Sequence, residues 1–176
     1  MRMSYEQIEV WVLGNPEFSV FVVLSVAFCE SFIIIGAFWP SIILLLLGVA
    51  LNEAEVKLLS ICLAAGIGSF VGDLLSFYLG SFFGPKLKET EFLQTKKDKI
   101  KKGEMFFYTY GWTGILIGRL TPAIKPFIPF IAGLAKMPSI TYVVSSLFAC
   151  FIWSLALAIL IIGIDNILIF FVLNIT

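Results

Sequence analysis

Four long apolar blocks alternate with short polar segments along this chain, at residues 18–51, 58–85, 105–135 and 139–163. A helix rises about 1.5 Å per residue, so roughly 20 apolar residues cross the hydrocarbon layer of a bilayer. The second and fourth blocks therefore each predict one transmembrane helix. The first and third blocks are too long for one upright crossing, so each is expected to break or turn back.

Prolines mark the places where the two longer blocks break. The segment GAFWP, which ends at Pro40, interrupts the first block, and Pro122, Pro126 and Pro129 interrupt the third. Proline lacks a backbone donor and clashes with the preceding helical turn. Broken backbone at membrane depth is tolerated where it is packed in protein or lines a wet cavity. Each block is therefore expected to form a re-entrant helical hairpin, with a steeply tilted crossing as the competing interpretation of the first.

Three longer segments lie outside these blocks. Residues 1–17 lack the apolar core of a signal peptide and are expected to lie at the membrane interface. Residues 86–104 form the one substantial polar loop, and their excess of lysine predicts a cytoplasmic location. The apolar tail, residues 164–176, is too short to span and is expected to pack on the bundle or at the interface.

Composition supports the same class and limits the chemistry. Hydrophobic residues make up 60% of the chain and charged residues 14%, and the mean hydropathy is +1.02, which predicts an all-α, multi-pass integral membrane protein. The net charge of zero argues against a nucleic-acid partner. The chain has no histidine, and its three cysteines have unrelated spacings, so we expect small buried thiols and no metal, cofactor or enzymatic activity. A lipid phosphatase of this membrane would usually need histidine.

Four charges lie deep within the apolar blocks: Glu30, Asp73, Arg119 and Lys125. A charge at the bilayer centre costs roughly 3 kcal/mol or more, so such residues usually face protein, water or a partner. These four sum to zero. Asp73 stands beside a row of small residues spaced four apart, which allows close helix packing either within the chain or in a homodimer. The row comprises Gly68, Gly72, Ser76, Gly80 and Gly84.

The two broken blocks share a weak internal repeat. Glu30 precedes Pro40 by the same interval at which Arg119 precedes Pro129, and each block is followed by a short polar link and a crossing. With the lysine loop in the cytoplasm, the two hairpins enter from opposite faces. Inverted repeats with interrupted helices that meet near mid-membrane are a recurrent transporter plan, with the substrate site where the repeats meet.

Three stretches resemble the DedA family of bacterial membrane proteins, which is related to the eukaryotic VTT-domain scramblases. They read CESFIIIGAFWPSIILLLLG, GDLLSFYLGSFFGPKL and GRLTPAIKPFIPFIAG, and the resemblance covers roughly residues 18–163. It implies two opposed re-entrant hairpins, an inner-membrane location, and movement of phospholipids or a polyprenyl phosphate between leaflets, with proton coupling in some members. Glu30 matches the first hairpin's acid, while Arg119 and Lys125 match a basic pair that is usually two arginines. Many members have Pro-Gly and a second acid where this chain has Pro40-Ser41-Ile42.

These features together suggest a lipid translocase. Arg119 and Lys125 are the predicted ligands of the phosphate of an anionic or zwitterionic lipid, such as undecaprenyl phosphate or phosphatidylethanolamine. Glu30 and Asp73 are expected to neutralise the cations in the empty state, and protonation of Glu30 would couple headgroup binding to a proton. The competing hypothesis is a buried charge network that only locks the hairpins together in a membrane scaffold or assembly factor. An ion channel would need a continuous polar lining, which this chain lacks.

Overall fold

The computed structural model describes residues 16–36, 38, 40–87, 97–119, 121 and 124–175. Within these ranges the chain is helical and contains no strand, as the sequence predicts. The helices are α2 (Pro16–Ser31), α3 (Ile33–Gly36), α4 (Ile42–Glu53), α5 (Leu58–Leu87), α7 (Lys97–Tyr110), α8 (Trp112–Arg119), α9 (Phe127–Leu134) and α10 (Ser139–Ile175).

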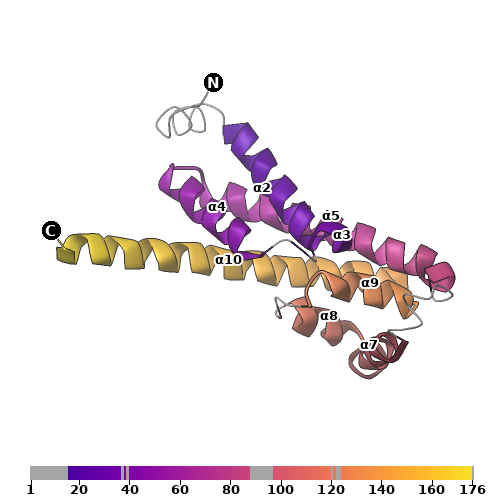
Figure 1. The fold of residues 1–176 in the computed structure, drawn as a ribbon. Coiled ribbons are helices and arrows are strands. Elements are labelled where there is room, and N and C mark those ends of the chain that lie inside the picture. The colour runs from indigo at the N-terminus through magenta and orange to yellow at the C-terminus, as the bar shows by residue number, and fades with distance from the viewer. Residues whose placement is uncertain are drawn as a thin grey trace.

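The two long helices, α5 and α10, run in opposite directions and form the frame of the molecule (Figure 1). Helices α2, α3 and α4 lie at one end of this frame, and α7, α8 and α9 lie at the other. Helix α5 packs against both α2 and α9, while α10 packs against both α4 and α8. The two groups of short helices are thus held to the same pair of long helices.

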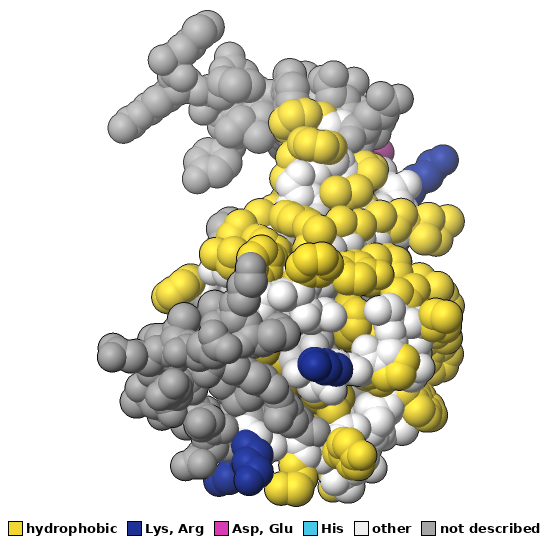
Figure 2. Space-filling view, turned by 90° about the vertical axis from the view of Figure 1, so that its right-hand side faces the viewer, with side chains coloured by type: hydrophobic (Ala, Val, Ile, Leu, Met, Phe, Trp, Pro, Cys, Tyr) yellow, Lys and Arg dark blue, Asp and Glu magenta, His cyan; other side chains and the backbone are white. Residues whose placement is uncertain are grey.

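Helices α5 and α10 account for the predicted crossings. In the described part of the chain, Leu58–Phe83 and Ser139–Ile164 are long and apolar enough to span a membrane. The outer side of α5 carries an exposed apolar row at Leu63, Ile67, Val71 and Leu75, while its inner side buries Asp73. Apolar groups outside and polar groups inside suit a helix that faces lipid. Figure 2 shows one face of the molecule, on which hydrophobic side chains predominate.

The first break lies between α2 and α4. Helix α2 ends at Ser31, the short α3 follows, and Pro40 stands just before α4. A hydroxyl from α5 satisfies the backbone at this break, because the Ile33 N–H donates to Ser76 Oγ at 2.9 Å. The same hydroxyl lies 2.8 Å from the Gly72 carbonyl oxygen, to which it donates. Helix α5 therefore supplies the hydrogen bond that the interrupted helix cannot make for itself.

The second break lies between α8 and α9, where the chain again reverses direction (Figure 1). Pro126 is the N-cap of α9, and Pro129 falls in its first turn, where a proline needs no helical donor. Pro122 lies outside the described residues. The two breaks touch, since a Cβ added to Gly36 would lie 3.1 Å from Pro126 Cβ. Helix breaks are therefore present in both long blocks, while their re-entrant, inverted placement in a bilayer stays a prediction.

The same turn joins α4 to α5 and α9 to α10. Glu55 and Lys136 both adopt left-handed backbone conformations, with φ of 60° and 54°. Each turn has the same pair of backbone hydrogen bonds. In the first turn, the Glu55 N–H donates to the Asn52 carbonyl and the Val56 N–H donates to the Leu51 carbonyl. In the second turn, the Lys136 N–H donates to the Gly133 carbonyl and the Met137 N–H donates to the Ala132 carbonyl. Paired bonds of this kind close a Schellman-type helix end. The likeness is local, and it agrees with the weak repeat in the sequence.

The small-residue row of α5 packs within the chain. A Cβ added to Gly68 would lie 2.2 Å from the Leu24 carbonyl oxygen, and a Cβ added to Gly80 would lie 2.2 Å from the Phe130 carbonyl oxygen. These distances are far below contact, so only glycine lets α2 and α9 approach α5 this closely. The sequence allowed two roles for this row, packing within the chain or contact in a homodimer. In the described residues the row packs within the chain, and a homodimer stays a prediction.

Two boundaries differ from the sequence analysis. Helix α10 continues without a break past Gly163 to Ile175, so the expected separate tail is an extension of the last helix. The expected lysine loop contains the start of α7, because the helix begins at Lys97. Residues 1–15 and 88–96, where the interfacial segment and the middle of the loop were expected, lie outside the described residues.

Candidate functional site

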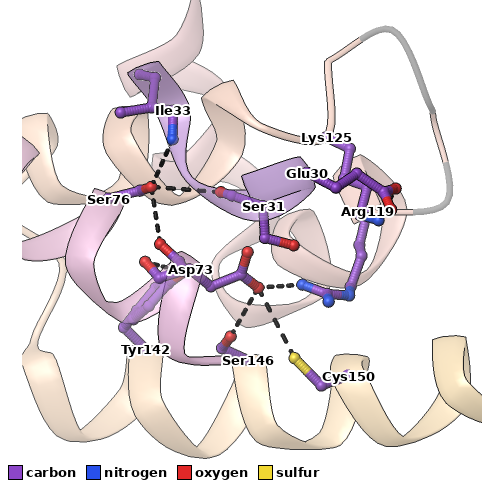
Figure 3. Close-up of polar contacts among 11 residues, drawn as sticks. Glu30, Ser31, Ile33, Asp73, Ser76, Arg119, Lys125, Tyr142, Ser146 and Cys150 are labelled. Atoms are coloured by element: carbon purple, nitrogen blue, oxygen red, sulfur yellow. Dashed lines mark hydrogen bonds and ion pairs between the residues drawn. The ribbon is translucent and has the colours of Figure 1, made fainter. Parts of the chain in front are cut away.

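The four deep charges come together as two buried ion pairs where the two breaks meet (Figure 3). Lys125 Nζ donates to Glu30 Oε1 at 2.5 Å, and Arg119 Nη1 donates to Asp73 Oδ2. The four side chains lie in the interior, with residue exposures of 2% for Glu30 and Asp73, 5% for Arg119 and 3% for Lys125. Each charge is therefore compensated by a direct partner of opposite sign.

Each charge sits at a position that the backbone determines. Glu30 lies in the last turn of α2, Asp73 lies in the middle of α5, and Arg119 is the last residue of α8. Lys125 lies in the turn that leads to α9. Because α8 ends at Arg119 and the chain then reverses, both cations of this segment point inward, toward acids from two different helices. One pair joins the two breaks, and the other joins the second break to α5.

Trp153 on α10 lies beneath both cations. The Lys125 Nζ is 3.9 Å from the centroid of its ring, and the Arg119 Cζ is 5.8 Å away. Desolvated cation–π contacts contribute about 2 kcal/mol or more. Trp153 was not among the site residues predicted from the sequence. The signal that could have found it is a row of polar and aromatic residues on one side of the largely apolar α10. The row comprises Tyr142, Ser146, Cys150 and Trp153.

Helix α10 also surrounds Asp73. Ser146 Oγ donates to Asp73 Oδ2 at 3.2 Å, and the Cys150 thiol lies 3.8 Å from the same oxygen. The Tyr142 hydroxyl donates to the backbone carbonyl of Asp73 at 3.4 Å, while its ring stacks on Phe77. Cys150 is thus a free, buried thiol, as predicted, but it contacts a charge as well as filling space.

The cations line a cavity of about 350 Å³ between α4 and α10. Arg119, one of its lining residues, has donors to spare, since its Nε and Nη2 atoms are buried and lack a hydrogen-bond partner among the described residues. These two nitrogens form one edge of the planar guanidinium, the edge that binds two oxygens of a carboxylate or phosphate side by side.

The acids are also incompletely satisfied. Glu30 Oε2 and Asp73 Oδ1 are buried and, in the part of the chain that the structure describes, accept no hydrogen bond. A buried polar group without a hydrogen-bond partner costs about 1–3 kcal/mol. Each acid therefore keeps one oxygen that could still accept a hydrogen bond.

The described residues contain no group of three or more His, Cys, Asp or Glu side chains arranged to hold a metal ion.

Comparison with known proteins identifies the family. Residues 38–162 match the VTT domain. The chain is 29% identical over 147 residues to the inner membrane protein YabI of Escherichia coli K12, a match that covers 83% of this chain and 58% of YabI. It is 25% identical over 150 residues to protein DedA of the same organism, covering 83% of this chain and 65% of DedA.

A further relative carries a functional name. The chain is 28% identical over 110 residues to undecaprenyl phosphate transporter A of Bacillus subtilis 168, covering 61% of this chain and 56% of that protein. The matched region thus spans little more than half the length of several relatives. A search of the solved structures finds no match. The VTT-domain match spans most of the chain and includes Asp73, Arg119 and Lys125, and the chain belongs to the DedA family of VTT-domain membrane proteins.

Proposed function

We propose that this protein moves a phosphate-bearing lipid between the two leaflets of the inner membrane, with Arg119 and Lys125 as the phosphate ligands. The observation that carries the proposal is the cavity that both cations line, together with the unpartnered Nε and Nη2 edge of Arg119. The relative named undecaprenyl phosphate transporter A supports a lipid phosphate as the substrate class. Undecaprenyl phosphate and phosphatidylethanolamine are the two substrates that we would compare.

Phosphate binding at this site is an exchange of partners. In the empty state Asp73 and Glu30 neutralise the two cations, which would otherwise be costly at this depth. A lipid phosphate brings its own negative charge, so it can replace an acid at a cation when the displaced acid takes up a proton. The spare guanidinium edge lets Arg119 contact the phosphate while Nη1 stays on Asp73.

Glu30 is the acid through which a proton would act. Its described contact is with Lys125, which itself lies near Arg119 and Asp73. Protonation of Glu30 removes the negative charge that holds Lys125, and the lysine is then free to attract phosphate. Headgroup binding would in this way be coupled to uptake of a proton at Glu30, while Asp73 keeps its arginine.

The test needs a variant that loses the arginine and keeps the fold. Removing one partner of a buried ion pair costs about 3–5 kcal/mol, whereas a neutral pair of similar shape is often tolerated. We would therefore compare wild type, Asp73→Asn/Arg119→Gln and Arg119→Lys in proteoliposomes with labelled undecaprenyl phosphate or phosphatidylethanolamine. The lysine variant keeps the charge at this position but loses the planar fork.

We expect wild type to move one of the two lipids, the double variant to lose this movement, and Arg119→Lys to retain a small part of it. Each variant must elute as a folded species with wild-type melting behaviour before its transport is interpreted. Unchanged transport by the folded double variant would refute the assignment of Arg119. Absence of transport by wild type with either lipid would favour the scaffold hypothesis, in which the ion pairs serve only to join the hairpins.

A further inference from the structure

The cavity beside the ion pairs has two ends of opposite character. Arg119 and Lys125 form the charged end, next to the ring of Trp153. The rest of the lining is almost entirely apolar and comes from Ile42 and Leu45 of α4 and from Ala156, Leu157 and Leu160 of α10, with Ser41 just before α4. The α10 residues follow Trp153 at spacings of three, four and seven positions, so they share one side of the helix.

The apolar end opens at the surface of the molecule. Ile42 and Leu160 are 54% and 52% exposed, whereas Leu157 and Lys125 are each 3% exposed. The cavity therefore runs from buried cations to an apolar rim between α4 and α10. Because α10 includes one of the two candidate membrane spans, this rim faces the bilayer when the helix is inserted.

We infer that the groove between α4 and α10 is a binding site for the hydrocarbon chain of the lipid whose phosphate lies at Arg119 and Lys125. This inference rests on the proposed function and adds where the chain lies and which residues contact it. A volume of about 350 Å³ is at the small end of ligand pockets, which typically measure about 300–1,000 Å³. It holds the phosphate and the nearest part of one chain, and the remainder passes over Ile42 and Leu160 into the bilayer.

This arrangement lets the headgroup exchange sides while the chain stays in hydrocarbon. The charged end offers the only strong attraction for phosphate among the lining residues, and the apolar end offers no partner for it. A water-soluble phosphate can use the charged end but gains nothing from the groove. Ala156 is the smallest lining side chain, so a bulkier residue at this position would reduce the space for a chain.

A photoreactive probe can locate the chain directly. We would use farnesyl phosphate carrying a diazirine near the phosphate, reconstitute the protein with it, irradiate, and map the labelled peptides. Labelling concentrated on the lining residues of α4 and α10, and lost on addition of excess unlabelled undecaprenyl phosphate, is the expected result. Labelling spread evenly over exposed residues of α10 such as Leu155 and Ile159 would overturn the inference.

A pair of neighbouring variants tests the same groove by function. Ala156→Phe fills the lining, while Leu155→Phe adds bulk to a residue that is 51% exposed and does not line the cavity. We expect Ala156→Phe to lower lipid phosphate transport at least tenfold and Leu155→Phe to leave it near wild type. Equal transport by the two folded variants would overturn the assignment of the groove as the site of the hydrocarbon chain. The phosphate site would still be tested separately by the double variant Asp73→Asn/Arg119→Gln. Loss of transport in that double variant alone would therefore keep the proposed function and reject the chain site.

Discussion

The close approach of α5 to α2 depends on Gly68, and it can be tested against a glycine only two positions away. A Cβ added at Gly68 would lie 2.2 Å from the carbonyl oxygen of Leu24 and 3.0 Å from its carbonyl carbon. A Cβ added at Gly66 would meet the Ser154 side chain at 3.7 Å, an ordinary contact. Gly68→Ala and Gly66→Ala therefore both add one methyl group to α5. The methyl group at position 68 meets the backbone of α2, whereas the methyl group at position 66 has room.

The expected difference follows from this geometry. Carbon–oxygen contacts are comfortable at about 3.3 Å or more, so Gly68→Ala must push α2 away by roughly 1 Å. Overpacking of this kind costs about 1–3 kcal/mol. Both variants gain similar helix propensity, about 0.8–1.0 kcal/mol for Ala over Gly. That gain cancels in the comparison, so Gly68→Ala should be less stable than Gly66→Ala by about 1–3 kcal/mol.

The assay is unfolding in detergent followed by tryptophan fluorescence, with the oligomeric state measured by light scattering on the same samples. For a protein of this size each kcal/mol corresponds to about 2–4 °C in Tm. Equal melting of the two alanine variants would refute the packing argument for Gly68. If Gly68→Ala instead dissociated a dimer at unchanged monomer stability, the glycine row would be an interface between two copies of the chain.

Four further predictions concern the buried charges, the first helix break and the two left-handed turns. In a double-mutant cycle, Glu30→Gln and Lys125→Gln should each cost about 3–5 kcal/mol alone, and the double variant should recover most of that loss in unfolding measurements. The pH dependence of lipid transport should disappear in Glu30→Gln, which keeps Lys125 as a phosphate ligand, if Glu30 carries the coupled proton. Ser76→Ala should cost about 1–3 kcal/mol, because it leaves the backbone N–H at the α2–α3 break without its partner, and amide hydrogen exchange there should accelerate. Glu55→Gly and Lys136→Gly should each raise stability by up to about 1 kcal/mol, since glycine adopts the left-handed conformation without strain, and a drop in Tm for either would contradict this account.

Local features of the sequence predicted much of this fold. Proline positions located both helix breaks, and the apolar length of residues 58–85 predicted α5 closely. The end of α10 was predicted less well, because Gly163 was taken as its limit. A single glycine weakens a helix by about 1 kcal/mol but does not end it unless the backbone turns away, and the apolar residues that follow allow the helix to continue.

The pairing of charges could not be predicted from one sequence. Depth in the apolar blocks identified Glu30, Asp73, Arg119 and Lys125, because isolated charges in such blocks need partners. Which acid meets which cation depends on how the hairpins pack, since the residues of the Glu30–Lys125 pair are 95 positions apart. The contribution of Trp153 is likewise a tertiary effect, because it requires α10 to pass beneath the second break.

The two ion pairs are not equivalent, and this bears on how the site would work. The Asp73 carboxylate accepts hydrogen bonds from both Arg119 and Ser146 through one oxygen, so two donors hold it in place. Arg119 is the last residue of α8, where the negative end of the helix dipole favours a cation. Glu30 lies in the last turn of α2, where the same dipole disfavours an acid, and its described contact is Lys125. Exchange with a lipid phosphate is therefore expected to begin at Lys125, with the Asp73–Arg119 pair as the fixed part of the site.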